Sequence, residues 1–170
     1  MIVTNQAIAA ASISITAGAL IWAAFSDLRH YLIPNRIPVL IAAAYAAIAS
    51  ALPLTFVIGG FLTGLAVLAL GMLVFARGWM GGGDVKLMAA VALWAGPTFL
   101  PVFGLVTSVS GAILALIMLS PARRMLPDPS IDALELTGAD GTAARQPMPF
   151  GVAIAMGGLF LAALYLPLLR

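Results

Sequence analysis

Two aspartates are the residues of this chain whose type and position best suit chemistry. Asp27 follows one apolar run, and Asp84 follows three glycines and begins another. An acid at the edge of the membrane loses solvation, which is costly and usually marks a functional site. Two carboxyl groups close together cannot easily both ionise, so they would share one proton and act as a pair.

Such a pair predicts hydrolysis of a peptide bond. The ionised acid takes a proton from water as the water attacks a carbonyl, and the protonated acid donates to the developing oxyanion. This chemistry requires neither a metal nor a nucleophilic side chain. The glycines at 81–83 leave no side chains before Asp84, so a peptide substrate could approach closely.

Each aspartate also has a purely structural interpretation. Asp84 follows a glycine run and precedes an apolar helix, which is typical of an N-cap. Asp27 could be a partly solvated interfacial acid beside Arg29. The catalytic interpretation therefore depends on the two acids lying together.

Other chemistries find little support in the sequence. Cysteine is absent and His30 is the single histidine, which excludes thiol catalysis and argues against a histidine-based zinc site. No serine elbow accompanies His30, and the glycines before Asp84 lack the Gly-Lys-Ser/Thr pattern of a phosphate-binding loop. We expect no metal and no cofactor, and a net charge of +2 is too small to indicate nucleic-acid binding.

The composition predicts a membrane protein. Hydrophobic residues make up 63% of the 170 residues and charged residues 8%, with a mean hydropathy of +1.13. Soluble domains usually carry about 25% charged residues. We therefore expect one all-α, polytopic domain over 1–170, embedded in the lipid bilayer. The run at 7–25 is too long for a typical signal peptide and is predicted as a retained span.

Six membrane spans are predicted from the apolar runs, because a spanning helix needs roughly 20 apolar residues. They lie at about 7–25, 37–52, 57–76, 85–95, 98–119 and 148–168. The run at 85–95 is short and ends at Gly96-Pro97. Gly60 and Gly64 have the small-xxx-small spacing that allows helices to pack closely.

The basic residues predict the orientation of these spans. Six spans place Arg29, Arg36, Arg77, Lys86, Arg123, Arg124 and Arg145 on one side and only Arg170 on the other, seven against one. Without the span at 85–95 the ratio falls to five against three. The positive-inside rule then predicts both termini outside and both aspartates at the cytoplasmic face.

The polar stretch at 120–147 is predicted to be a mobile cytoplasmic loop. Its acids, Asp128, Asp132, Glu135 and Asp140, allow a second hypothesis, in which they attract a basic partner segment.

The residues around both aspartates resemble the type IV prepilin peptidases. Three segments carry the resemblance: Asp27-x-Arg29-x-x-x-Ile33-Pro34-Asn35, Gly81-x-Gly83-Asp84 continued by Val85-Lys86-Leu87, and Pro149-Phe150-Gly151 before the last span. Presenilin-type proteases share Gly-x-Gly-Asp, but their Tyr-Asp and Pro-Ala-Leu motifs are absent here.

This resemblance implies an aspartic endopeptidase of the bacterial inner membrane, active at the cytoplasmic side. Its substrate would be a prepilin, cut after a glycine between a basic leader peptide and a hydrophobic helix. Catalysis would fall to Asp27 and Asp84. The resemblance implies that Gly81, Gly83, Lys86, Pro34, Asn35, Pro149 and Gly151 shape the site, although Lys86 could instead anchor a helix at the lipid headgroups.

One departure from the family concerns a second activity. Larger members carry a cytoplasmic region with paired cysteines and methylate the new N-terminus. This chain has no cysteine, so methylation does not carry over; it resembles the short peptidases of Tad/Cpa (Flp-type) pilus systems. The rival hypotheses are a small transporter or channel, which would need an ionisable group at mid-membrane, and a structural subunit of a secretion or pilus complex.

Overall fold

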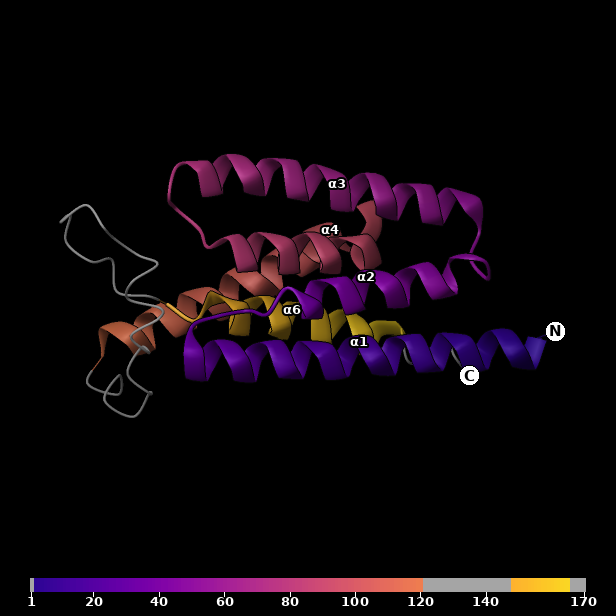
Figure 1. Cartoon of the computed structure of the whole chain (residues 1–170), viewed down its shortest axis with the longest axis horizontal. Coiled ribbons are helices and arrows are strands. Elements are labelled where there is room, and N and C mark those ends of the chain that lie inside the picture. Colours follow the sequence, from indigo (N-terminus) through magenta and orange to yellow (C-terminus); the bar gives the residue numbers. More distant parts are fainter. Residues whose placement is uncertain (1, 121–147, 166–170) are drawn as a thin grey trace.

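The described part of the chain is all-helical, which confirms the all-α part of the predicted fold class. The structure is a computed structural model that describes residues 2–120 and 148–165, with side chains described from residue 6 onward. The described helices are α1 (Ile2–His30), α2 (Arg36–Ala49), α3 (Leu54–Ala76), α4 (Gly82–Leu119) and α6 (Phe150–Tyr165). They lie roughly along one common direction (Figure 1). The acids predicted to attract a partner lie outside the described residues.

Three of the described helices are long and apolar enough to cross a membrane. These are the segments Gln6–His30, Leu54–Ala76 and Gly82–Leu119. Helices α2 and α6 are also apolar but shorter. The predicted count of six spans and the orientation with both termini outside stay predictions.

Helix α4 covers two of the predicted spans, and it reverses direction between them. At Gly96 the backbone leaves the helical region, with φ 55° and ψ −174°. A side chain disfavours this conformation, so glycine suits it. The first arm (82–95) and the second arm (97–119) therefore run in opposite directions (Figure 1). The predicted break at Gly96-Pro97 is confirmed.

Glycines let α3 pack closely against the first arm of α4. A Cβ atom added to Gly64 would lie 2.6 Å from the Leu93 side chain, and one at Gly71 would lie 2.6 Å from Val85. At Gly60 it would collide with the carbonyl oxygen of Leu93. The predicted small-xxx-small contact of α3 is confirmed, and its partner is α4.

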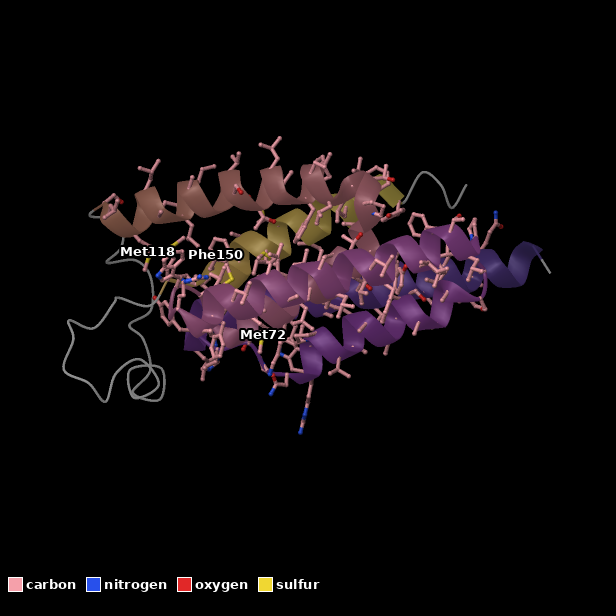
Figure 2. All side chains as sticks on the ribbon, turned by 90° about the horizontal axis from the view of Figure 1, so that it is seen from above. Met72, Met118 and Phe150 are labelled. Carbon is pink, nitrogen blue, oxygen red and sulfur yellow. The ribbon has the colours of Figure 1, made fainter. Side chains whose placement is uncertain are left out.

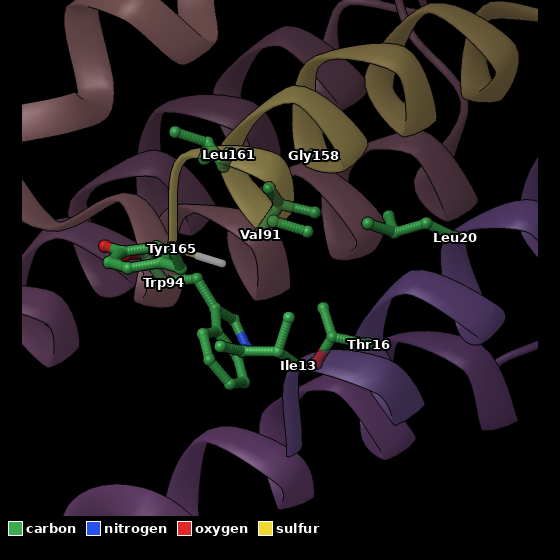
Figure 3. Close-up of a pocket in the computed structure, with 9 residues that line it drawn as sticks. Ile13, Thr16, Leu20, Val91, Trp94, Gly158, Leu161 and Tyr165 are labelled. Carbon is green, nitrogen blue, oxygen red and sulfur yellow. The ribbon is translucent and has the colours of Figure 1, made fainter. Parts of the chain in front are cut away.

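The innermost core lies where α1, the first arm of α4 and α6 meet. Leu20, Val91 and Leu161 come from these three elements, and each is at most 2% exposed. They line a cavity of about 10 Å³, at whose edge lies Thr16 (Figure 3). The hydroxyl of Thr16 is buried without a hydrogen-bond partner among the described residues.

The outer faces of the helices carry apolar side chains instead of charges. Val39 on α2, Leu70 on α3 and Leu116 on α4 are each between 63% and 67% exposed. Side chains like these stand out from the helices on several sides in Figure 2. An apolar surface of this extent suits contact with lipid rather than water, which agrees with a membrane protein.

Candidate active site

Asp27 lies in the last turn of α1 rather than beyond the helix, and it is buried. The helix continues to His30 and ends at Tyr31, whose φ is 54° and whose N–H donates to the Asp27 carbonyl at 2.8 Å. Only 4% of Asp27 is exposed, so the interpretation as a partly solvated acid is wrong. The neighbouring Arg29 instead places its guanidinium 4.4 Å from the ring centre of Phe25.

Asp84 lies in the first turn of α4 and does not cap it in the predicted way. The N-cap position belongs to Gly81, whose extended backbone has φ −69° and ψ 143°. Asp84 is the third helical residue, so the N-cap prediction is wrong. Its carboxyl group accepts a hydrogen bond from the N–H of Gly81 instead. This is the reverse half of a capping box, in which the third residue binds back to the cap.

The two aspartates lie near each other at the same end of the molecule. Asp27 is buried and Asp84 is half-buried, and the charge of Asp27 acts directly on the carboxyl group of Asp84. Topology explains the meeting: α1 ends where α4 begins, because α2 and α3 cross the molecule once in each direction (Figure 1).

A third element, the start of α6, completes the surroundings of Asp27. The carboxyl group of Asp27 accepts hydrogen bonds from the N–H groups of Gly151 and Val152. Its Oδ2 atom is buried and has no hydrogen-bond partner in the described part of the chain. A Cβ atom added to Gly151 would lie 2.8 Å from this Oδ2. Glycine is therefore required if α6 is to approach the acid this closely.

Ile33 connects the surroundings of the two acids. Its Cβ would lie 3.2 Å from a Cβ added to Gly83, directly before Asp84. Its Cδ1 would lie 2.7 Å from a Cβ added to Gly151, beside Asp27. One half-buried side chain thus contacts the backbone next to each aspartate. Sequence reasoning did not single out Ile33, although the Ile-Pro-Asn motif contains it.

Lys86 and Asn35 form a direct contact between α4 and the start of α2. The Lys86 Nζ donates a hydrogen bond to the Asn35 Oδ1 at 2.9 Å, across 51 residues of sequence. Asn35 stands at the N-cap position of α2, yet its side chain makes no capping hydrogen bond. Both residues were predicted to shape the site, and the structure brings them together.

The predicted prolines hold the chain at two helix starts. Pro34 lies two residues before the start of α2, and its carbonyl accepts from the N–H of Ile37 at 3.0 Å. Pro149 is fully buried directly before α6, and its carbonyl accepts from Val152 at 3.2 Å. Sequence reasoning missed Val152 and also Ser26, whose Oγ donates to the Leu32 carbonyl at 2.8 Å. The position of Ser26 directly before Asp27 was the only available signal.

An apolar groove reaches Asn35 and Lys86. It has a volume of about 400 Å³ and lies between α2, α3 and the first arm of α4. Asn35 and Lys86 line it, together with small residues such as Gly64 and Ala89. Among the described residues, no cluster of three or more histidines or acids is placed to hold a metal ion.

The fold and the site together define an all-helical, strongly apolar protein with a coupled pair of carboxyl groups. The sequence pattern of the type IV leader peptidase family matches residues 14–116, more than half of the chain, and the chain belongs to this family. The match includes both aspartates but not 149–151. No curated protein and no solved structure matches the chain. The predicted family, and a peptidase activity with it, are confirmed; the Flp-type subgroup stays a prediction.

Proposed function

We propose that this protein is an aspartic endopeptidase in which Asp27 and Asp84 together activate a water molecule. The observation that carries the proposal is that Ile33 packs both against Gly83, directly before Asp84, and against Gly151, beside the Asp27 carboxyl group. Two acids 57 residues apart in sequence, on two different helices, therefore lie on either side of one side chain. Glycines stand beside both acids, Gly83 before Asp84 and Gly151 against Asp27, and their missing side chains let Ile33 pack between the starts of α4 and α6, next to both carboxyl groups.

The two acids exchange protons with the substrate in turn. The ionised acid takes a proton from water as the water oxygen attacks the scissile carbonyl carbon, and the protonated acid donates to the carbonyl oxygen. When the carbon–nitrogen bond breaks, the first acid gives its proton to the amine nitrogen. The second acid recovers its proton from the hydroxyl group as the new carboxyl group forms. The pair returns to its starting state and titrates as one unit.

The proposed substrate is a type IV prepilin of the Flp-like kind. Its basic leader peptide would lie in the cytoplasm, and its hydrophobic helix in the lipid bilayer. The enzyme would cross the bacterial inner membrane six times, with both arms of α4 as separate spans and both termini outside. Seven of the eight basic residues then lie on the cytoplasmic side, which supports this orientation.

A leader-cleavage assay tests the proposal. The purified full chain in lipid nanodiscs is incubated with a prepilin that has a short basic leader, and wild type is compared with Asp27→Asn and Asp84→Asn. Because each acid transfers protons in the reaction, we expect each variant to lose roughly 10²- to 10⁴-fold in rate. The measurement is the loss of the leader by mass spectrometry.

A matched control separates the two aspartates from acids in general. Asp132→Asn, in the stretch at 120–147, should cleave at the wild-type rate. Circular dichroism must show that all variants keep their helices. Normal cleavage by Asp27→Asn or Asp84→Asn would exclude the mechanism, and no cleavage by wild type would favour the transporter or structural-subunit alternatives.

A further inference from the structure

The segment between α1 and α2, residues 31–35, contacts all three elements that surround the two aspartates. Its start is held by Asp27 at the end of α1, through the hydrogen bond from the Tyr31 N–H. Its Ile33 contacts the backbone of Gly83 and of Gly151, at the starts of α4 and α6. The segment therefore lies between the parts of the chain that must stay in register for the acids to act as a pair.

A side-chain hydrogen bond ties this segment to α4. It is the bond of 2.9 Å from the Lys86 Nζ to the Asn35 Oδ1. Asn35 lies two residues after Ile33, and Lys86 lies two residues after Asp84. Residues two apart on a helix do not share a face, so Lys86 holds α4 from a side other than that of Asp84.

The local chemistry of Asn35 supports a role beyond the stability of α2. Asparagine is among the best N-cap residues because its side chain can accept hydrogen bonds from the first helical N–H groups. Here its backbone is already helical, with φ −57° and ψ −21°, and its side chain makes no such bond. Its side-chain oxygen accepts from Lys86 instead. The contact between two helices takes the place of a local cap.

We infer that Asn35 and Lys86 are a positioning pair, which keeps Ile33 against Gly83 and Gly151 and thereby holds the two aspartates at their working separation. Neither side chain touches the reacting atoms in this role. The inference rests on the proposed function, and it differs from the interpretation in which Lys86 alone anchors α4 at lipid headgroups.

A double-mutant cycle tests the pair in the cleavage assay. Lys86→Met and Asn35→Leu each remove one partner, and we expect each to lower kcat by roughly 10- to 100-fold, as small misplacements of reacting groups do. KM should stay unchanged because substrate contacts are kept. The double variant should be no slower than the slower single variant, since the two residues act as a unit.

Conservative variants serve as matched controls for the same positions. Asn35→Asp keeps the acceptor and Lys86→Arg keeps a donor, so both should retain most of the wild-type kcat. If Asn35→Leu cleaves normally while Lys86→Met does not, lipid anchoring by Lys86 explains the data and the inference is wrong. A raised KM with unchanged kcat would instead indicate contact with substrate and also overturn it.

A distance measurement tests the inference without using activity. The chain has no cysteine, so Leu32→Cys and Leu73→Cys introduce the only two thiols for spin labels. Both side chains are exposed, Leu32 at 38% and Leu73 at 57%. Double electron–electron resonance should show one narrow distance distribution in the chain that carries only these two cysteine substitutions. Adding Lys86→Met should broaden the distribution, and adding Lys86→Arg should leave it narrow.

The cleavage rate and the distance distribution together distinguish the proposed function from the positioning role of Asn35 and Lys86. If wild type fails to cleave prepilin but Lys86→Met broadens the distances, the proposed function fails while the link between the helices stands. If wild type cleaves and Lys86→Met changes neither kcat nor the distances, the positioning role is refuted and the proposed function survives.

Discussion

Gly151 is the residue whose missing side chain decides how closely α6 approaches Asp27. A Cβ atom there would lie 2.7 Å from Ile33 Cδ1 and 2.8 Å from Asp27 Oδ2, closer than atoms normally pack. We therefore predict that Gly151→Ala moves α6 or Ile33 away from the acid and lowers the cleavage rate by at least about 10-fold, in line with the cost of small misplacements. The leader-cleavage assay measures this rate.

Gly104 provides the matched control for that substitution. It also lies in a helix, and a Cβ atom added to it meets no atom within 4 Å. Gly104→Ala should leave the cleavage rate unchanged, and it should not lower the unfolding temperature because alanine favours helix more than glycine does. Equal rates for Gly151→Ala and wild type would show that close approach of α6 is unnecessary.

For single residues, the sequence indicated which side chains could take part in catalysis, but not what surrounds them. Asp27 and Asp84 stood out because acids are rare in so apolar a chain. Their local roles were less predictable: Asp84 proved to be the third helical residue instead of the cap, and Asp27 proved buried. Ile33 gave no signal of its own, since an isoleucine in an apolar chain resembles any other core residue.

Among the helices, α4 is the element whose geometry most affects the arrangement of the molecule. Its two arms reverse direction at Gly96, where φ is 55° and ψ is −174°. The first arm packs against α3 and, through Val91, against Gly158 of α6. The second arm also meets α6, with Gly111 against Phe150 and Gly157 against Thr107. The reversal thus lets both arms of one helix contact α6.

We predict that Gly96→Ala destabilises the protein by about 1 to 3 kcal/mol, because this backbone region is nearly exclusive to glycine. The thermal unfolding temperature in detergent, followed by circular dichroism, measures the loss. Gly18→Ala is the control, since Gly18 lies within α1 and a Cβ atom there meets nothing within 4 Å. An unfolding temperature of Gly96→Ala equal to that of wild type would mean that the reversal does not depend on this conformation.

Helix boundaries were predicted well where proline or glycine fixes them. The chain reverses at Gly96-Pro97 as expected. The end of α1 was predicted too early, at residue 25, because the apolar run stops there while the helix continues to His30. Backbone hydrogen bonding extends past the continuous apolar run, and hydropathy does not report it.

For the whole molecule, the predicted orientation puts the end that carries Asp27 and Asp84 on the cytoplasmic side. The turn between α3 and α4 lies at this end, and the turn between α2 and α3 lies at the other (Figure 1). Trp79 lies in the turn between α3 and α4 and is 67% exposed. Leu54 directly follows the turn between α2 and α3 and is 72% exposed. Single cysteines at either position can be labelled because the natural chain has none.

We predict that a membrane-impermeant maleimide added to intact spheroplasts labels Leu54→Cys but not Trp79→Cys. The positive-inside bias is the physical reason, since basic residues resist translocation. Opening the membrane should expose Trp79→Cys to the reagent, which controls for its reactivity. Labelling of Trp79→Cys in intact spheroplasts would contradict the orientation.

The sequence by itself determined that the protein is helical and apolar, and it singled out the two aspartates as the candidate site residues. It could do so because composition and residue type are local properties. It also placed both acids at one end, since an even number of crossings separates them. Only the tertiary structure decided what surrounds them: Gly151 against Asp27, Ile33 between the glycines, and Lys86 bonded to Asn35. These contacts join residues from opposite parts of the chain, and close packing of particular side chains, which no local pattern encodes, selects them.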